Sequence, residues 1–589
     1  MIKLLKNLRK KEIIMAIICV ILVLGQVYFD LLLPDFMSDL TVLIKTPGSK
    51  MADIWQTGGK MLGCTLASAV LCIICGYLSA KVAAGFSFTI RSKLFFHVLD
   101  LGKQEMQEFS VPSLINRTTN DITQIQMFIS MGLQILVRAP VMAVWAVFKI
   151  LGKSWELSAV TAVFVAILTT ASALIISRVI PRFRIVQKLT DQINRVAREN
   201  LTGINVVHAF NAEEYQNNKF EVPNDKLMCT QMANQKLFAI FQPMMGLGMN
   251  GLALCIYWLG AVLLNNIALT DMAGRLTMFS NIVVFSTYAT YVVMSFMMMI
   301  MIFMMFPAAQ VSAVRINEVL KTKAAIKEGC INQGNEVGTV EFKDVSFAYP
   351  GTAEEQLSDI SFKVNRGETI AFIGATGSGK TTLISLIARF FDATKGEVLI
   401  DGINIKDYSF EALYNKIGYI TQKAVLFSGS IDENIRFGES ASEPSEADID
   451  QALSIAQATE FVENQEDGKN YRIAQSGKNV SGGQKQRLSI ARALARKPEI
   501  LIFDDSFSAL DYRTDAALRS ALAENLKDTT RVIVAQRIST IRHADKIVVL
   551  ENGKSVGIGT HDELINNCDV YREIAMSQLS ERELARKEA

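Results

Sequence analysis

The sequence predicts two domains of different fold class, an all-α membrane domain with six spanning helices followed by an α/β domain. The chain of 589 residues is too long for one hydrophobic core. Half of its residues are hydrophobic and only 20% are charged, and the apolar residues concentrate before residue 310. The remainder has the composition of a soluble domain. A formal net charge of +2 provides no basic field, so we expect no nucleic-acid partner.

Six segments of the N-terminal part are apolar over the roughly 20 residues that a bilayer crossing requires. They are about 13–33, 61–80, 130–151, 157–180, 238–264 and 276–306. The N-terminus and the segments 81–126 and 181–237 carry 18 Lys and Arg, against five in the loops between the other span ends. Because cytoplasmic loops carry the positive excess, we expect both termini in the cytoplasm. The predicted organisation is a membrane domain at 1–310, a linker at 311–338 and a cytoplasmic domain at 339–589.

Several features of the membrane domain have both a functional and a structural interpretation. The polar interruptions 113–126 and 198–215 are either short docking helices or solvated connectors. Arg138 and Lys149 lie in or near the third span, where a charge either serves a substrate path or extends to the interface. The sixth span has no charge and contains seven methionines between positions 294 and 305. Met-rich surfaces adapt to varied apolar ligands, although lipid contact and helix packing explain the same pattern.

The second domain contains a phosphate-binding motif. Residues 369–373 (TIAFI) predict a buried strand, which GATGSGKT and then a helical run follow directly. In this context the G-x-x-x-x-G-K-[ST] loop surrounds nucleotide phosphates with backbone N–H groups at a helix N-terminus. Lys380 can reach the β- and γ-phosphates, and the Thr381 hydroxyl can hold Mg²⁺. The predicted nucleotide-binding residues are Gly374, Ala375, Thr376, Gly377, Ser378, Gly379, Lys380, Thr381 and Thr382.

Further motifs follow this loop in a fixed order. Gln422 lies in YITQ, Ser481 begins SGGQKQR, and the apolar strand ILIFDD leads to Asp504. Alone, the Ser-Gly-Gly turn would indicate only a helix cap. Together the motifs resemble the ATP-binding cassette (ABC) family, in which a phosphate loop, Q-loop, signature, second Asp motif, D-loop and switch loop occur in this order.

The resemblance implies roles for individual residues between 340 and 560, with ATP and Mg²⁺ as cofactors. Tyr349 would stack on adenine, Asp504 would hold Mg²⁺, and Gln422 would serve both the Mg²⁺ site and catalysis. The signature and D-loop residues expected to contact nucleotide are Ser481, Gly482, Gly483, Gln484 and Asp511. Six spans before one cassette resemble an exporter half-transporter, which favours the docking-helix interpretation of the two polar interruptions.

Two catalytic positions depart from the family pattern. Family members that hydrolyse ATP carry Glu after the Mg²⁺-binding Asp, whereas this chain has Asp505, whose side chain is one methylene shorter. The switch-loop His is replaced by Gln536, which forms hydrogen bonds but has no charge or transferable proton. A displacement of about 1 Å can lower a rate about 100-fold. We therefore expect this site to bind ATP and hydrolyse it slowly; adequate turnover after neutral drift is the alternative.

An intact signature beside altered catalytic positions favours a heterodimer. In this family two cassettes close head to tail, and each signature covers the ATP of the other chain. Ser481–Gln484 can therefore complete the site of a homologous half-transporter that supplies the Glu and the His. A homodimer would hold two altered sites. We expect the partner's signature to be the altered one.

The favoured function is one subunit of an ATP-driven exporter in a bacterial plasma membrane. The Met- and Phe-rich sixth span favours amphipathic or hydrophobic compounds, with multidrug efflux as the leading case and lipid as the other. A homodimeric lipid or peptide exporter and an ATP-gated regulatory or channel protein are the alternatives. Import is also compatible with the sequence, whereas six spans exclude a soluble cassette ATPase.

Overall fold

The computed structural model describes residues 2–46, 48–151, 154–268, 270–352, 354–438 and 443–579. It divides into two compact units. The first comprises Met1–Val98 and Val111–Thr322, and the second comprises Leu99–Ser110 and Lys323–Ala589.

The first unit is entirely helical. Among the described residues, six helices are long and apolar enough to cross a membrane, which confirms the six predicted spans; the third consists of α5, a π-helical turn and α6. The helices are α1 (Ile2–Leu5), α2 (Lys10–Lys45), α3 (Met51–Leu99), α5 (Val111–Asn116), the π turn (Arg117–Asp121), α6 (Ile122–Leu151), α7 (Trp155–Thr202), α8 (Ile204–Ala209), α9 (Glu213–Asn265) and α10 (Met272–Lys321). With 53 residues, α9 is about 80 Å long, which exceeds the bilayer core of about 30 Å.

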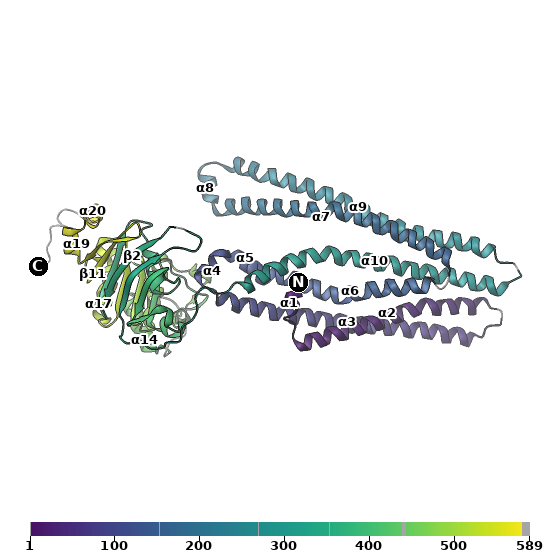
Figure 1. Cartoon of the computed structure of the whole chain (residues 1–589), viewed down its shortest axis with the longest axis horizontal. Helices are drawn as coiled ribbons and strands as arrows, with labels where there is room; N and C mark the ends of the chain where they lie inside the picture. Colours follow the sequence, from purple (N-terminus) through teal and green to yellow (C-terminus); the bar gives the residue numbers. More distant parts are fainter. Residues whose placement is uncertain are drawn as a thin grey trace. The chain divides into compact units, whose positions relative to one another are not determined.

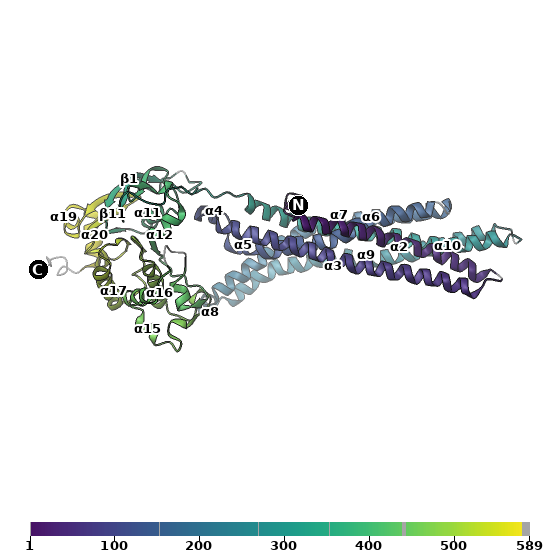
Figure 2. The same ribbon diagram turned by 90° about the horizontal axis from the view of Figure 1, so that it is seen from below.

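These helices form two groups within the unit. In Figures 1 and 2, α7 and α9 run alongside each other and are joined by α8, while α2, α6 and α10 pack together. Small residues allow the close contacts. A Cβ on Gly248 of α9 would lie 2.6 Å from Leu168 of α7, and one on Gly260 would lie 2.7 Å from Ile282 of α10. A larger residue at either position would displace the side chain of Leu168 or Ile282.

Two ion pairs join α2 to α6, and they involve the two cations of the third span, Arg138 and Lys149. Arg138 Nη2 lies 3.0 Å from Asp30 Oδ2, and Lys149 Nζ lies 2.6 Å from Asp35 Oδ2. The acidic partners lie near the end of the first span and were not considered from the sequence. Each cation paired with a nearby carboxylate costs less free energy than an isolated charge in lipid would.

Hydroxyl groups from two further helices complete this set of contacts. Ser68 of α3 donates to Asp30 Oδ1 at 2.5 Å. Tyr288 of α10, which is fully buried, donates to Asp35 Oδ1 and to the Leu31 carbonyl, each at 2.8 Å. We call Asp30, Asp35, Arg138, Lys149, Ser68 and Tyr288 the polar cluster. It connects four helices and lies in the C-terminal halves of α2 and α6.

The second unit contains two main sheets. The larger has the order β12-β11-β3-β10-β9-β6 and is parallel except for β12; the smaller is antiparallel with the order β2-β1-β4-β5. The strands are β1 (Val340–Phe347), β2 (Leu357–Val364), β3 (Thr369–Gly374), β4 (Lys395–Ile400), β5 (Ile403–Asn404), β6 (Ile417–Ile420), β7 (Gly429–Ser430), β8 (Arg472–Ile473), β9 (Ile500–Asp504), β10 (Thr530–Val534), β11 (Lys546–Glu551) and β12 (Lys554–Gly559). Strand β10 pairs with both β3 and β9, so the carboxyl ends of these two strands lie close together.

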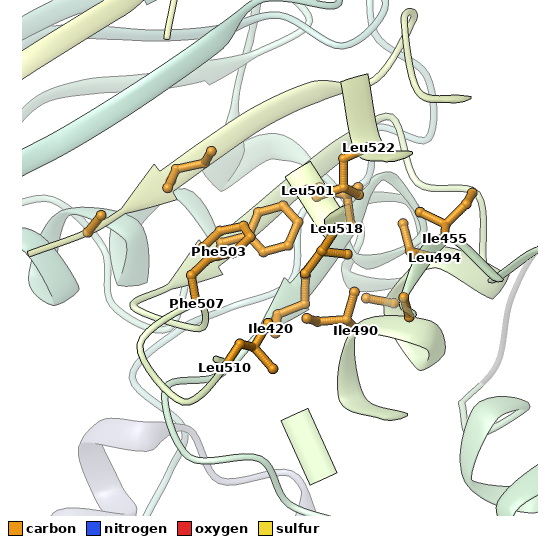
Figure 3. Packing of buried hydrophobic residues seen from close by; sticks show 14 of the residues in the cluster. Ile420, Ile455, Ile490, Leu494, Leu501, Phe503, Phe507, Leu510, Leu518 and Leu522 are labelled. Carbon is orange, nitrogen blue, oxygen red and sulfur yellow. The ribbon is translucent and has the colours of Figure 1, made fainter. Parts of the chain in front are cut away.

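Helices pack against the larger sheet and bury its apolar side chains. Figure 3 shows Leu501 and Phe503 of β9 beside Ile490 of α16 and Leu518 of α17. The helices of this unit are α4 (Lys103–Glu108), α11 (Lys380–Ile387), α12 (Phe410–Lys416), α13 (Ile431–Ile435), α14 (Glu446–Ile455), α15 (Thr459–Glu463), α16 (Gly482–Ala495), α17 (Tyr512–Asn525), α18 (Ile538–Ile541), α19 (His561–Asn567) and α20 (Asp569–Gln578).

Helix α4 belongs to the second unit although it lies in the chain between α3 and α5. The Lys103 ammonium lies 5.5 Å from the ring centre of Phe390 and 5.7 Å from that of Phe391. Glu105 is buried and accepts hydrogen bonds from the backbone N–H groups of Gly102 and Ala325. The sequence-based boundaries do not include this insertion.

The two polar interruptions have different structures. Segment 113–126 is not a separate helix, because α5 continues through the π turn into α6. The short helix of the first inner segment is α4, ten residues before that position. In the second inner segment, α8 lies within 198–215 as a separate short helix. The membrane domain was expected to end at residue 310, but this position lies inside α10. The helix continues to Lys321, and α10 packs on the π turn, η1.

We expect Lys416→Met to destabilise the second unit strongly. Lys416 Nζ lies 2.7 Å from Asp401 Oδ2 and 2.8 Å from Glu499 Oε2, and Asp401 is fully buried. Removing the cation leaves an uncompensated buried carboxylate, which costs about 3 kcal/mol. For a domain of this size that lowers Tm by roughly 6–12 °C, measurable by calorimetry on the full chain. Lys395→Met, which removes an exposed pair with Glu355, is the control and should change Tm little.

Candidate nucleotide-binding site

The phosphate loop connects β3 to α11. Gly374 and Gly379 have φ angles of 157° and 100°, which other residues rarely adopt. A Cβ on Gly374 would lie 2.1 Å from the Leu550 carbonyl oxygen, and one on Gly379 would lie 2.6 Å from Leu357. The loop backbone thus lies too close to its neighbours to leave room for a side chain at Gly374 or Gly379. The first backbone N–H groups of α11 lie at the end of this loop. This is the arrangement that binds phosphate.

Lys380 folds back over this loop. Its ammonium group donates to the carbonyl oxygens of Gly374 and Ala375, each at 2.8 Å, and lies 3.4 Å from Ser378 Oγ. Burial lowers the pKa of Lys380, while Asp505 acts in the opposite direction. The cation is therefore held at the loop that receives the phosphates, bound only to neutral oxygens.

The two side chains whose oxygens are expected to bind Mg²⁺, Thr381 and Asp504, lie together. Thr381 Oγ1 donates to Asp504 Oδ1 at 3.1 Å, and the Tyr419 hydroxyl donates to Asp504 Oδ2 at 3.2 Å. Burial raises the pKa of the Asp504 carboxyl. A hydroxyl and a carboxylate beside a phosphate loop suit Mg²⁺, which binds few protein oxygens together with phosphate oxygens. Tyr419 was not predicted, because only the folded sheet brings β6 next to β9.

Asp505 is held by two amide groups. Its Oδ2 accepts hydrogen bonds from Gln422 Nε2 at 3.2 Å and from Gln536 Nε2 at 2.9 Å. Its backbone has a φ of 48°, a left-handed conformation that Asp tolerates better than most residues. Burial raises the pKa of the Asp505 carboxyl. Gln422 thus contacts the acidic residue expected in catalysis, and none of its hydrogen bonds in the described structure reaches Thr381 or Asp504.

Tyr349 is next to the start of α11. Its hydroxyl lies 2.9 Å from Thr382 Oγ1, and its ring packs edge-on against Phe347 and Phe391. The ring is only partly buried. It therefore retains a surface on which a base could stack.

The signature and D-loop residues form a separate group. Ser481 caps α16 and forms a capping box with Gln484, and Asp511 caps α17 by accepting from the Thr514 N–H. A Cβ on Gly483 would lie 3.5 Å from the Ala509 carbonyl oxygen, so the two helix starts are neighbours. Within the described residues, no hydrogen bond or ion pair joins Ser481–Gln484 to the phosphate loop. One chain thus presents two incomplete groups of nucleotide-site residues.

The geometry defines a class: a membrane domain of six helices fused to a domain with a phosphate loop and a signature helix. The family model described as ABC transporter matches residues 357–508, and that described as ABC transporter transmembrane region matches residues 13–296. The chain belongs to the ABC transporter family.

Similar proteins agree with this assignment. An uncharacterized ABC transporter ATP-binding protein of Mycobacterium tuberculosis is 38% identical over 535 residues, 90% of each chain. An ATP-dependent lipid A-core flippase of Pseudomonas syringae is 32% identical over 531 residues, 90% of this chain and 84% of the flippase. The solved structure of a bacterial Atm1-family ABC exporter with ATP bound has a TM-score of 0.81 at 21% identity, covering 97% of this chain and 100% of that one. The fold is therefore that of an ABC exporter half-transporter.

Proposed function

We propose that this chain is the catalytically weak subunit of a heterodimeric ABC exporter. One observation carries the proposal. A single oxygen of the Asp505 carboxylate, Oδ2, accepts hydrogen bonds from both Gln422 and Gln536. An oxygen that already accepts hydrogen bonds from two amide N–H groups is less available to an attacking water. Asp505 is also one methylene too short to extend past these amides, and Gln536 has no proton to exchange.

Binding of ATP does not require these two side chains. Lys380, the N–H groups of the loop and the Tyr349 ring would hold ATP, and Thr381 with Asp504 would hold Mg²⁺. The metal would neutralise phosphate charge when bound. We therefore expect this site to bind ATP and allow the two cassettes to close, with little hydrolysis of the ATP it holds.

The intact signature supports a role at the partner's site. The capping box fixes Ser481 at the N-terminus of α16, and Gly482 and Gly483 leave the first turn exposed. An exposed helix N-terminus can contact a phosphate held by another chain. A homologous half-transporter with Glu and His at the catalytic positions would then hydrolyse ATP for the pair.

In the proposed cycle, ATP closes the two cassettes and hydrolysis on the partner resets them. Helices α4 and α8 would transmit this motion to the spans, which would open alternately to the cytoplasm and to the outside. The protein would lie in the plasma membrane of a bacterium with both termini in the cytoplasm. Its substrates would be amphipathic or hydrophobic compounds, including drugs.

Two alternative functions are a homodimeric lipid exporter and an ATP-gated ion channel. Similarity to a lipid A-core flippase favours a lipid substrate, and a homodimer would then need Asp505 to be an adequate base. An ATP-gated ion channel is disfavoured by the polar cluster, because Asp30 and Asp35 neutralise Arg138 and Lys149.

The test compares the ATPase rate of this chain alone, in lipid, with that of the chain co-purified with a co-expressed related half-transporter. We expect turnover only from the pair, and Ser481→Ala should lower the rate of the pair about tenfold or more. Ser445→Ala removes the same kind of cap from α14 outside the site and is the control. An ordinary rate from the chain alone would contradict the heterodimer and indicate a homodimeric exporter.

A further inference from the structure

A large cavity lies between α1, α6 and α10 of the membrane unit. Its volume is about 1290 Å³, larger than the roughly 300–1,000 Å³ of a pocket for a drug-sized ligand. Phe128 and Leu136 of α6 and Phe303 and Phe306 of α10 line its apolar part. None of the seven methionines of the sixth span is among its described lining residues; one of them, Met297, lines a separate small pocket with Met245 and Phe296.

The polarity of the cavity changes along α10. The lining residues run from Phe303 and Phe306 through Gln310 to Lys321 near the end of the helix. Phe303 and Lys321 are 18 positions apart, which corresponds to about 27 Å along the axis. Such a gradient complements a molecule with a polar head and a hydrocarbon tail, whereas ordinary lipid contact requires only an apolar surface.

The polar end of the cavity has an excess of positive charge. Glu318 lies there, but Arg117 Nη1 is 2.9 Å from its carboxylate and compensates it. Lys3 and Lys321 also line the cavity, and neither forms an ion pair within the described part of the chain. Two cations beside a compensated carboxylate would attract an anionic group.

We infer that this cavity binds an anionic amphiphile, with its phosphate or carboxylate headgroup at Lys3 and Lys321 and its hydrocarbon chains along Phe303 and Phe306. This inference rests on the proposed export function and narrows its substrate class from amphipathic compounds to acidic lipids. A zwitterionic amphiphile would gain no net charge interaction at this headgroup position, and a cationic one would be repelled.

The experiment uses the full chain in phosphatidylcholine nanodiscs and two photoreactive lipids with the same tail, a phosphatidic acid and a phosphatidylcholine. Labelled peptides are identified by mass spectrometry. We expect the phosphatidic acid to label α6 and α10 about tenfold more than the phosphatidylcholine. Lys3→Ser/Lys321→Ser should reduce this labelling to the phosphatidylcholine level. Lys50→Ser/Lys60→Ser removes the same charge from residues that do not line the cavity and should have no effect.

Other outcomes overturn the inference. Equal labelling by both lipids, or labelling that the Lys3/Lys321 variant does not change, would exclude a headgroup site at these residues. Competition by inorganic phosphate would identify a phosphate site without a lipid. Loss of labelling when the related half-transporter is bound would show that the partner chain occupies the cavity. Because binding is measured without ATP hydrolysis, failure here leaves the heterodimer proposal to its own ATPase test.

Discussion

Asp505→Glu combined with Gln536→His should raise the ATPase rate of this chain, purified alone in lipid, by about 100-fold. The longer side chain extends its carboxylate past the two amides that now hold Asp505 Oδ2. Histidine also restores a group that can exchange a proton near neutral pH. The chain carries its own signature at Ser481, so two copies could form complete sites once these residues are restored.

The controls separate restored catalysis from contamination. Adding Lys380→Met to the double variant removes the cation at the phosphate loop and should abolish the gained rate. Each single substitution should recover only part of the gain, because the two side chains act on the same water. A double variant as slow as the natural chain, with ATP binding intact, would show that these two positions do not limit hydrolysis.

Arg138→Leu should destabilise the membrane domain by about 3 kcal/mol, because it leaves Asp30 charged among α2, α3 and α6 without its cation. Asp30→Leu should have a similar effect, because it leaves the Arg138 cation without its carboxylate. The double variant Asp30→Leu/Arg138→Leu should recover most of the loss, since replacing both partners by apolar groups removes the desolvation cost. Thermal unfolding of the four proteins in the same detergent measures this cycle.

The pair Lys219–Glu199 provides the comparison, because both side chains are about half exposed. Its double-mutant cycle should show a coupling of at most about 1 kcal/mol. An Arg138–Asp30 coupling no larger than this would mean that water reaches the pair and that the polar cluster contributes little to stability.

Local motifs made most of the nucleotide site predictable. The GATGSGKT loop follows a buried strand and precedes a helix, so neighbouring residues alone determine its shape. The six spans were equally predictable, because a bilayer crossing requires a run of about 20 apolar residues.

The contacts between distant segments could not be predicted in this way. Asp30 and Arg138 are 108 positions apart, and only the packing of α2 on α6 shows that each neutralises the other. Gln422, Asp505 and Gln536 were identified from motifs, but their hydrogen bonds depend on how β6, β9 and β10 align. The place of α4 depends on contacts with Phe390 and Phe391, almost 300 positions later in the chain.

The Asp30–Arg138 pair also has a consequence for biosynthesis. Asp30 enters the bilayer with the first span, and its partner is made 108 residues later. At about 5–20 residues per second this interval is roughly 5–20 s. During it, the first span contains a carboxylate that costs up to about 3 kcal/mol in lipid. Arrival of the third span, which carries Arg138, removes this cost, and the order of synthesis becomes part of how this membrane domain assembles.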